Sequence, residues 1–315
     1  SARPRSTRAG TGAQAVGMGR SLFDAYAESR AVFEEVDEAL GEKLSGLIFE
    51  GPEERLTLTH NAQPALMAVS IAAMRALEAE GFSVGEARYV AGHSLGEYSA
   101  LAAAGALGIA ETARLLRLRG EAMQAAVPAG EGAMAAILGL DAAAVAELCV
   151  RAAEGEVLSP ANDNGGGQIV ISGSAAAVAR AVALAPEAGA KRAIPLAVSA
   201  PFHCSLMAPA AAAMAEALKG ATVNAPRVPI LSNVTASPTS DPAEIRDRLV
   251  RQVTGEVRWR ESMEYLAGAG VVDIVEIGSG KVLAGLAKRI DKRLSAQAIG
   301  TAEAVKAFAA SRQPG

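Results

Sequence analysis

Hydrophobic residues recur every three to four positions along several stretches of the chain, and elsewhere they form short continuous runs. The first pattern is typical of amphipathic helices and the second of buried strands. Outside the middle of the chain, helices are predicted over residues 21–40, 64–80, 96–106, 111–127 and 281–293. Short apolar strands are predicted over residues 87–91, 228–232 and 271–276. This alternation of strands and helices indicates an α/β protein with a mostly parallel sheet.

Residues 127–198 follow a pattern of their own. Strands are predicted here over residues 133–138, 157–161, 168–172 and 192–198, and helices over residues 142–153 and 175–184. The resulting order, β-α-β-β-α-β, is the split plan of a ferredoxin-like subdomain. The polar, glycine-rich residues 162–167 are expected to form its central hairpin turn. We expect this small subdomain to be inserted into a larger domain made of residues 1–126 and 199–315.

Composition narrows the class of protein. A chain of 315 residues has room for one large domain with a small insertion. A net charge of −4 and an aromatic share of 3% argue against a nucleic-acid partner, which needs a basic face or stacking platforms. The two cysteines, Cys149 and Cys204, cannot build a disulfide framework, which favours a reduced, cytoplasmic setting. Only three histidines are present, and no metal site is expected.

Membrane and targeting segments are not expected either. The longest small-apolar stretch, residues 100–110, is far shorter than the roughly 18–20 residues of a spanning helix. The start of the chain carries Arg3, Arg5 and Arg8 but no apolar segment follows, so it does not match a secretory signal. Its arginines and serines faintly resemble an organellar transit peptide, although a disordered end is the favoured interpretation.

The segment Gly-His-Ser-Leu-Gly at residues 92–96 matches the nucleophile-elbow pattern G-x-S-x-G. It has the context that this pattern requires, because a strand is predicted before it and a helix after it. Ser94 is therefore the candidate nucleophile, and the N–H of Leu95 at the head of the helix is a candidate oxyanion donor. The alternative is that small residues merely fill a strand–helix turn, and the flanking pattern favours the nucleophile.

A nucleophilic serine needs a base, and the chain offers His60, His93 and His203. His93 precedes the serine on an extended segment, so its side chain is expected to point the other way and to hold the elbow. His60 precedes a predicted helix, where a capping or surface role is favoured. His203 follows a proline on a loop after the small subdomain, where such folds carry catalytic groups. By elimination, His203 is the candidate base.

Arg119 lies on the apolar stripe of the helix predicted over residues 111–127, together with Leu115 and Met123. An arginine on such a face is costly unless it meets an anion. Its guanidinium group either snorkels to solvent, forms an internal salt bridge, or binds a substrate carboxylate through two parallel hydrogen bonds.

Taken together, these motifs resemble the malonyl-CoA:acyl carrier protein transacylases and, more distantly, the acyltransferase domains of polyketide synthases. The resemblance spans about residues 12–293. It is carried by six segments: residues 14–19 (QAVGMG), 63–66 (QPAL), 92–98 (GHSLGEY), 119–120 (RG), 201–203 (PFH) and 278–283 (GSGKVL). The resemblance implies an α/β-hydrolase-like large domain in which Ser94 takes the acyl group, His203 acts as its base and Arg119 binds the free carboxylate of malonate.

Further roles follow from the resemblance alone. It implies that the backbone carbonyl of Gln252 orients His203 in place of an acidic residue. Phe202 and Leu95 are similar to the malonyl-selective pattern of the family rather than to the methylmalonyl one. The pocket is expected to be lined by four side chains: Gln63, Phe202, Met123 and His93.

The start of the chain departs from the family. Its members open with an apolar strand that leads into a Gly-Gln-Gly-Ser-Gln-like loop, whose first glutamine lends a backbone N–H to the oxyanion. Here residues 1–9 are polar and basic, and Thr11 stands at the glutamine position. Because the donor is a backbone group, Thr11 is the expected second oxyanion donor.

The expected function is transfer of a malonyl group from malonyl-CoA to the phosphopantetheine thiol of a separate acyl carrier protein. The product would feed fatty-acid or polyketide synthesis, and the family suggests a monomer that uses no cofactor or metal. Two alternatives remain open at this point. One is a serine hydrolase that acts on esters or thioesters through the same elbow, and the other is a non-catalytic module that binds a carrier protein.

Overall fold

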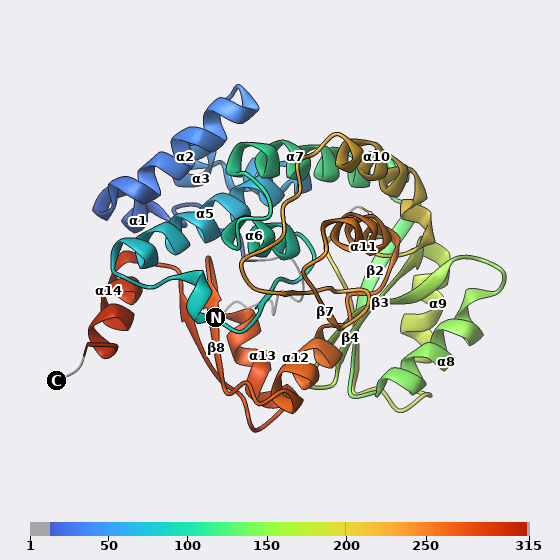
Figure 1. The fold of residues 1–315 in the computed structure, drawn as a ribbon. Coiled ribbons are helices and arrows are strands. Elements are labelled where there is room, and N and C mark those ends of the chain that lie inside the picture. Colours follow the sequence, from blue (N-terminus) through green and yellow to red (C-terminus); the bar gives the residue numbers. More distant parts are fainter. Residues whose placement is uncertain (1–12, 199, 314–315) are drawn as a thin grey trace, which may run out of the picture.

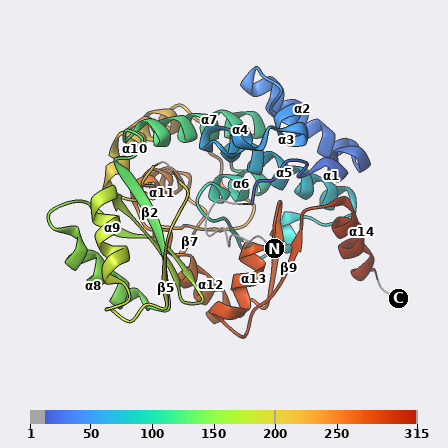
Figure 2. The same ribbon diagram turned by 180° about the vertical axis from the view of Figure 1, so that it is seen from behind.

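The computed structural model describes residues 13–198 and 200–313. Over these residues the chain is a mixed α/β protein, with helices packed around three small sheets (Figure 1). A sheet covered by helices α8 and α9 lies at one end of the molecule. Helix α14 and the C-terminus lie at the opposite end, as the view from behind also shows (Figure 2).

The first part of the chain is mainly helical. Its helices are α1 (Arg20–Ala25), α2 (Ala27–Leu40), α3 (Leu44–Glu50), α4 (Glu53–Thr57), α5 (Thr59–Ala79), the 3-10 turn η1 (Val84–Glu86), α6 (Gly96–Ala103) and α7 (Ile109–Ala125). The single helix predicted over residues 21–40 is divided at Tyr26, whose backbone is extended (φ −129°, ψ 122°). At this break the Tyr26 hydroxyl donates to Glu80 (2.8 Å), which connects the junction of α1 and α2 to the end of α5.

The predicted small subdomain has the expected order of elements. It comprises β2 (Gly132–Leu138), α8 (Ala142–Ala153), β3 (Leu158–Gly165), β4 (Gln168–Ser174), α9 (Ala175–Leu184) and β5 (Arg192–Pro195). The strands form an antiparallel sheet in the order β3-β4-β2-β5. Ala135 and Ile137 face α8 and α9, whereas Met134 and Ala136 belong to a second cluster on the other face. This alternation gives the sheet an inner face that turns toward the rest of the chain.

The turn predicted over residues 162–167 is wrong. Strand β3 continues to Gly165, and only Gly166 and Gly167 separate it from β4. The reason is a partner that lies far away in the sequence. The N–H of Asp163 donates to the carbonyl of Val257 (3.0 Å), and the N–H of Val257 donates to that of Ala161 (2.8 Å). These bonds keep the polar end of β3 extended and connect it to the C-terminal part.

The remaining strands form two short sheets rather than the single, mostly parallel sheet that the pattern predicts for the large domain. Over the described residues, one sheet has the order β1-β6-β7 and the other pairs β8 with β9. The strands are β1 (Val90–Ala91), β6 (Ile230–Leu231), β7 (Pro238–Thr239), β8 (Asp273–Ile277) and β9 (Ser295–Ile299). Pairs β1–β6 and β8–β9 are parallel, and β6–β7 is antiparallel. Strand β1 is shorter than predicted, because only Val90 and Ala91 pair with β6; before it, Nη1 of the Arg88 side chain donates to the carbonyl of Ala269 (2.7 Å).

The C-terminal part contains helices that the hydrophobic pattern did not single out. Its helices are η2 (Ser205–Met207), α10 (Ala208–Lys219), α11 (Pro242–Thr254), α12 (Trp259–Gly268), α13 (Val282–Ile290) and α14 (Ala302–Ser311). Of these, only α13 was predicted, as residues 281–293. That helix was expected to close the fold, which is wrong, because β9 and α14 follow it. In both views helix α11 lies beside the small sheet, between it and α6 (Figures 1 and 2).

None of the helices in residues 13–198 and 200–313 combines the length and apolar character that crossing a membrane requires. The same residues contain no group of three or more His, Cys, Asp or Glu side chains arranged to hold a metal ion.

Candidate active site

Ser94 lies on a tight turn between β1 and α6, in the strand–turn–helix context that its motif predicts. Its backbone is left-handed (φ 56°), a conformation that costs a residue other than glycine about 1–3 kcal/mol. The turn also needs Gly92, because a Cβ atom there would lie 1.9 Å from the carbonyl oxygen of Gly96. The chain thus holds the serine in a strained and closely packed turn, and the Ser94 residue is 6% exposed.

His203 lies against this serine, although 109 residues separate them in the sequence. The Ser94 hydroxyl donates to Nε2 of His203 (2.8 Å), and Nδ1 of His203 donates to the backbone carbonyl of Gln252 (2.9 Å). A carbonyl only accepts hydrogen bonds, so Nδ1 carries the ring proton and the lone pair of Nε2 faces the hydroxyl. This is the geometry of a serine with an oriented base.

The surroundings keep His203 neutral. Burial, with a smaller contribution from the positive charge of Arg119, lowers the pKa of His203 to about 3, and the hydrogen bond to Gln252 opposes the shift. The imidazole therefore remains unprotonated at neutral pH and is available to accept a proton.

Arg119 is 1% exposed and reaches the same point from α7. Its Nη1 donates to Oε1 of Gln63 (2.7 Å), and its Nη2 donates to Oε1 of Gln252 (2.8 Å) and to the Ser94 hydroxyl (3.2 Å). All three acceptors are neutral. Its Nε is buried and has no hydrogen-bond partner within the described residues. A buried cation without a direct anionic partner, beside a serine hydroxyl, is a ready site for a carboxylate.

The close approach of α5 and α7 brings Gln63 to Arg119. A Cβ atom on Gly120 would lie 2.4 Å from Cα of His60, so only glycine allows the two helices to meet there. Helix α5 begins at Thr59, five residues before the predicted start at residue 64, and this extra turn includes His60 and Gln63. Nε2 of Gln63 donates to Thr59 (2.9 Å) and lies 3.8 Å from the sulfur of Met123. Gln63 and Met123 are therefore neighbours beside Arg119.

Gln252 contacts the other members through both its backbone and its side chain. Besides its carbonyl contact with His203 and its Oε1 contact with Arg119, its Nε2 donates to the backbone carbonyl of Ser94 (3.0 Å). Gln252 is fully buried near the end of α11. Only the backbone contact follows from the resemblance, and the side-chain contacts are new.

The structure adds two buried polar residues that the sequence did not single out, Asn233 and Glu97. The Asn233 side chain contacts the elbow backbone on both sides of His93, and the Glu97 carboxyl group accepts the Asn233 N–H. Two signals were available in the sequence. Asn233 directly follows a predicted apolar strand, at the edge where parallel strands carry functional groups. Glu97 is an acidic residue at the start of the largely apolar α6.

His93 turns away from the serine, as predicted. Its Nε2 lies 2.8 Å from Oδ1 of Asn164, and its ring packs 5.6 Å from that of Trp259. Burial lowers the pKa of His93. The side chain thus connects the elbow to the extended end of β3 and to α12.

Three predicted site residues remain: Phe202, Leu95 and Thr11. Phe202 packs between the main core and the inner face of the small sheet, next to His203. Leu95 directly precedes α6, and its N–H has no acceptor in the part of the chain that the structure describes. Thr11 lies outside the described residues.

Comparisons with known proteins agree with this geometry. Residues 8–304 match the acyl transferase domain family. The malonyl CoA-acyl carrier protein transacylase of Bacillus subtilis (strain 168) is 48% identical over 298 residues, which are 94% of this chain and 93% of the relative. The enzyme of the same name from Escherichia coli (strain K12) is also 48% identical and covers 95% of this chain and 96% of its own.

Solved structures give the same result. The acyl-carrier-protein-S-malonyltransferase of Bartonella henselae superposes with a TM-score of 0.93 at 57% identity, over 96% of each chain. A malonyl-transacylase solved in complex with its type II PKS acyl-carrier protein has a TM-score of 0.93 at 42% identity, over 96% of this chain and 97% of its own. From the match over nearly all of its length, this chain belongs to the acyl transferase domain family.

Proposed function

We propose that this protein transfers a malonyl group from malonyl-CoA to the phosphopantetheine thiol of an acyl carrier protein, through a malonyl ester on Ser94. The names of the relatives support this substrate and acceptor. One relative forms a complex with its carrier protein, which supports a separate protein as the acceptor. The malonyl-carrier product would supply fatty-acid or polyketide synthesis.

The observation that carries this proposal is the position of Arg119. Its Nη2 lies 3.2 Å from the Ser94 hydroxyl, its Nε lacks a partner among the described residues, and its other acceptors are neutral amides. In a malonyl group the carboxylate carbon is two bonds from the carbonyl carbon that Ser94 would attack. A guanidinium group beside the nucleophile therefore suits malonyl, whereas an acetyl group offers it no charge.

In the first half-reaction, Nε2 of His203 takes the hydroxyl proton while Oγ of Ser94 bonds to the thioester carbonyl carbon. The N–H of Leu95, at the positive end of α6, is the donor that we assign to the resulting oxyanion, and Thr11 is the second donor that we propose. The carbon–sulfur bond then breaks, and the sulfur of coenzyme A takes the proton from His203. A malonyl-serine ester remains.

The second half-reaction repeats these steps in reverse order. The carrier thiol gives its proton to His203 and attacks the ester carbonyl carbon. The bond to Oγ of Ser94 breaks, and the proton returns from His203 to the serine. Because one thioester is exchanged for another, the two half-reactions balance with no cofactor, oxidant or metal.

We assign the architecture accordingly. Residues 127–198 would be a ferredoxin-like insertion in an α/β-hydrolase-like domain made of residues 1–126 and 199–315. The antiparallel order β3-β4-β2-β5 and the two covering helices support the first assignment. The acyl pocket would then lie where the two parts meet, lined by three of the four predicted side chains: Gln63, Phe202 and Met123. The fourth, His93, does not fit this assignment, because its side chain turns away from Ser94 toward Asn164 and Trp259.

We also infer that the protein works as a monomer in the cytoplasm, without a nucleic-acid or membrane partner. All the side chains assigned to the reaction belong to one chain, which supports a monomer. Cys149 and Cys204 are free and buried, in keeping with a reduced compartment.

Mass spectrometry of the intact protein after mixing with malonyl-CoA tests the proposal. A malonyl adduct on Ser94 is expected, and Ser94→Ala serves as the control that cannot form it. Adding a phosphopantetheinylated carrier protein should discharge the adduct faster than water does. Discharge by water alone would instead indicate a hydrolase, and the absence of any adduct a binding module.

A further inference from the structure

We propose that Asn233 and Glu97 are positioning residues for the nucleophile. The side-chain amide of Asn233 would clamp the backbone on either side of His93, and the carboxyl group of Glu97 would hold Asn233 in place. This inference rests on the proposed role of Ser94 in acyl transfer, and it assigns a function to two buried polar groups that the reaction above does not use.

The sheet brings Asn233 to the elbow. Strands β1 and β6 are parallel neighbours, with Val90 opposite Ile230 and Ala91 opposite Leu231. Both strands therefore end at the same edge, so that the residue two positions after β6 lies beside the residues that follow β1. Asn233 is that residue, and it is 1% exposed.

The amide of Asn233 is matched to its partners atom by atom. Its Oδ1 accepts the backbone N–H of Ser94 (2.8 Å) and Nε2 of Gln252 (3.2 Å), while its Nδ2 donates to the backbone carbonyl of Gly92 (2.8 Å). An N–H can only donate and a carbonyl can only accept, so these partners determine which way the amide faces. One side chain thus bridges the two peptide groups that enclose the elbow.

Glu97 completes the arrangement from the other side of the turn. It is 3% exposed on the first turn of α6, and its Oε1 accepts the backbone N–H of Asn233 (2.6 Å). The N–H of Arg258 donates to the carbonyl of Asn233 (2.9 Å), so both peptide groups of Asn233 are anchored. Glu97, on the helix that begins at the elbow, therefore holds Asn233 in place, and Asn233 in turn holds the elbow.

The clamp has two consequences for the serine. It maintains the left-handed backbone of Ser94, which directs Oγ toward His203. It also occupies the N–H of Ser94, so the N–H of Leu95 remains as the donor at the head of α6. A misplacement of about 1 Å lowers catalytic rates on the order of 10²-fold, so loss of the clamp should be visible in the rate of acylation.

The first test uses Asn233→Ala and two reagents that react with Ser94. Malonyl-CoA reports acylation, and a small fluorophosphonate reports the reactivity of the serine without needing Arg119. We expect both rates to fall by about 10²-fold, with KM for malonyl-CoA changed less than about twofold because the contacts of Arg119 with Gln63 remain. Wild-type fluorophosphonate rates in Asn233→Ala, or a raised KM with unchanged kcat, would overturn the proposal.

Ser232→Ala is the matched control. Ser232 is the neighbouring buried residue (2% exposed), and its hydroxyl accepts from Arg248 (3.2 Å) and, within the described residues, forms no hydrogen bond with residues 92–96. The variant should react with both reagents at wild-type rates. A loss as large as that of Asn233→Ala would mean that any disturbance of this loop slows the serine, and would contradict a specific clamp.

A pair of variants at Glu97 tests the second part. Glu97→Gln keeps a carbonyl oxygen for the Asn233 N–H and should retain activity within about threefold, whereas Glu97→Ala removes it and should lose about tenfold or more. Equal effects of the two variants would overturn the role of Glu97.

Should Asn233→Ala fail to fold, as judged by circular dichroism, the pair of Glu97 variants decides the proposal. If the wild-type protein forms no malonyl adduct, the proposed function fails, while the fluorophosphonate rates still decide whether the clamp exists.

Discussion

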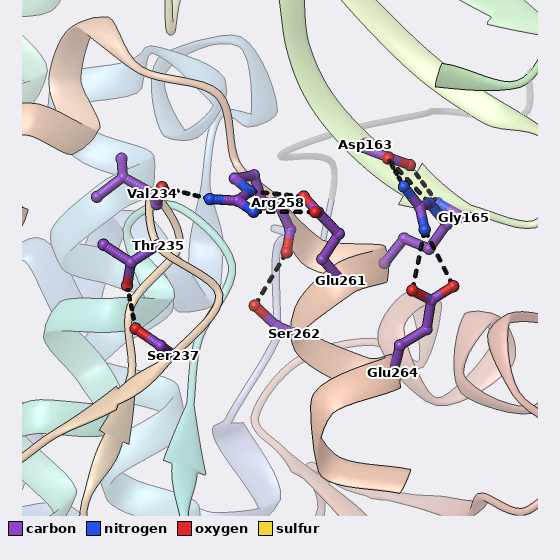
Figure 3. Close-up of polar contacts among 10 residues, drawn as sticks. Asp163, Gly165, Val234, Thr235, Ser237, Arg258, Glu261, Ser262 and Glu264 are labelled. Carbon is purple, nitrogen blue, oxygen red and sulfur yellow. Dashed lines mark hydrogen bonds and ion pairs between the residues drawn. The ribbon is translucent and has the colours of Figure 1, made fainter. Parts of the chain in front are cut away.

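Two polar clusters join distant segments of this chain, and they are built in opposite ways. The elbow cluster consists of Ser94, Arg119, His203, Asn233 and Gln252, all of them buried. The strap cluster, where β3 meets α12, consists of Asp163, Arg258, Arg260, Glu261 and Glu264 (Figure 3). In the first, the acceptors of the one buried cation, Arg119, are all neutral over the described residues. In the second, each arginine already has a carboxylate.

The exposure of the groups differs as well. Arg260 pairs with Asp163 (2.9 Å) and Glu264 (2.9 Å), and its side chain is 33% exposed. Although the Asp163 side chain is only 4% exposed, the arginines of this cluster already have carboxylate partners and therefore have little left to offer a ligand. Arg119 is costly to bury and has no carboxylate partner among the described residues, so it has the most to gain from a substrate carboxylate. The comparison thus distinguishes Arg119, whose charge is available to a ligand, from Arg258 and Arg260, whose charges hold two parts of the chain together.

The largest effect is expected in the elbow cluster on replacing His203. His203→Ala removes the base that takes the Ser94 proton and should slow acylation by about 10²–10⁴-fold. Stopped-flow measurement of coenzyme A release would show this, with circular dichroism as the control for folding. Acylation at the wild-type rate would contradict the assignment of the base.

The next largest effect is expected in acyl selectivity. Arg119→Met removes the cation and should lower the preference for malonyl over acetyl by on the order of 10²-fold or more, since losing the partner of a buried charge costs about 2–5 kcal/mol and each 1.4 kcal/mol is about tenfold. Arg119→Lys is the matched control, because it keeps the charge but not the planar fork, and it should retain part of the preference. Competition between malonyl-CoA and acetyl-CoA measures both. Unchanged selectivity in Arg119→Met would rule out the carboxylate contact.

A smaller effect is expected for Glu256, which lies beside the strap cluster and makes the stability of the fold depend on pH. Burial, with the nearby charge of Asp163, raises the pKa of Glu256 to about 7. The folded state thus binds the proton of Glu256 more tightly than the unfolded state does. The contribution of this group to stability is therefore complete below its pKa in the unfolded chain and is lost as pH rises through about 7. Glu256→Gln should therefore raise Tm by about 2 °C more at about pH 8 than at about pH 5.

Glu261→Gln is the control of opposite sign. Its hydrogen bond from Arg258 lowers the pKa of the Glu261 carboxyl group, so its contribution is present at neutral pH and is lost as pH falls. This variant should lower Tm more at about pH 8 than at low pH. A pH response of the same sign in both variants would contradict the assignment.

The smallest effect is expected for Glu264→Gln. This residue pairs with Arg260 at the surface, and its own side chain is 45% exposed. Its loss should change the free energy of unfolding by about 0.5 kcal/mol or less and leave kcat unchanged. Urea denaturation measures the first quantity. A loss of malonyl selectivity in Glu264→Gln as large as that in Arg119→Met would show that the two clusters are not independent.

The predictions that succeeded depend on residues close together in the sequence. Helices α8 and α9 have the predicted bounds, because short-range periodicity and a capping residue, Asp141 or Ser174, determine each one. The strand–turn–helix context of Ser94 was predicted for the same reason. Arg119 was singled out because a charge on an apolar stripe is visible in a single helix.

The features that were missed depend on contacts between distant residues. The break at Tyr26 comes with a contact to the distant Glu80, and the extended end of β3 pairs with the distant Val257. Asn233 lies 139 residues from the serine whose N–H it accepts. Its position after a predicted strand indicates a residue at the functional edge of the sheet, but the sequence does not show what it contacts, because its partners are mainly backbone groups, which every residue has.

By itself, the sequence determined the class of fold, the position of the nucleophile motif and the buried arginine, since each follows from local periodicity or a local motif. Only the tertiary structure decided how these residues meet. The pairing of β1 with β6 brings Asn233 to the elbow, and the contact at Gly120 brings Gln63 to Arg119. Helix α11 brings Gln252 to Arg119, Ser94 and His203. The physical reason is that hydrogen bonds and charges act over a few ångströms in space, and folding brings within that range residues that lie far apart in the sequence.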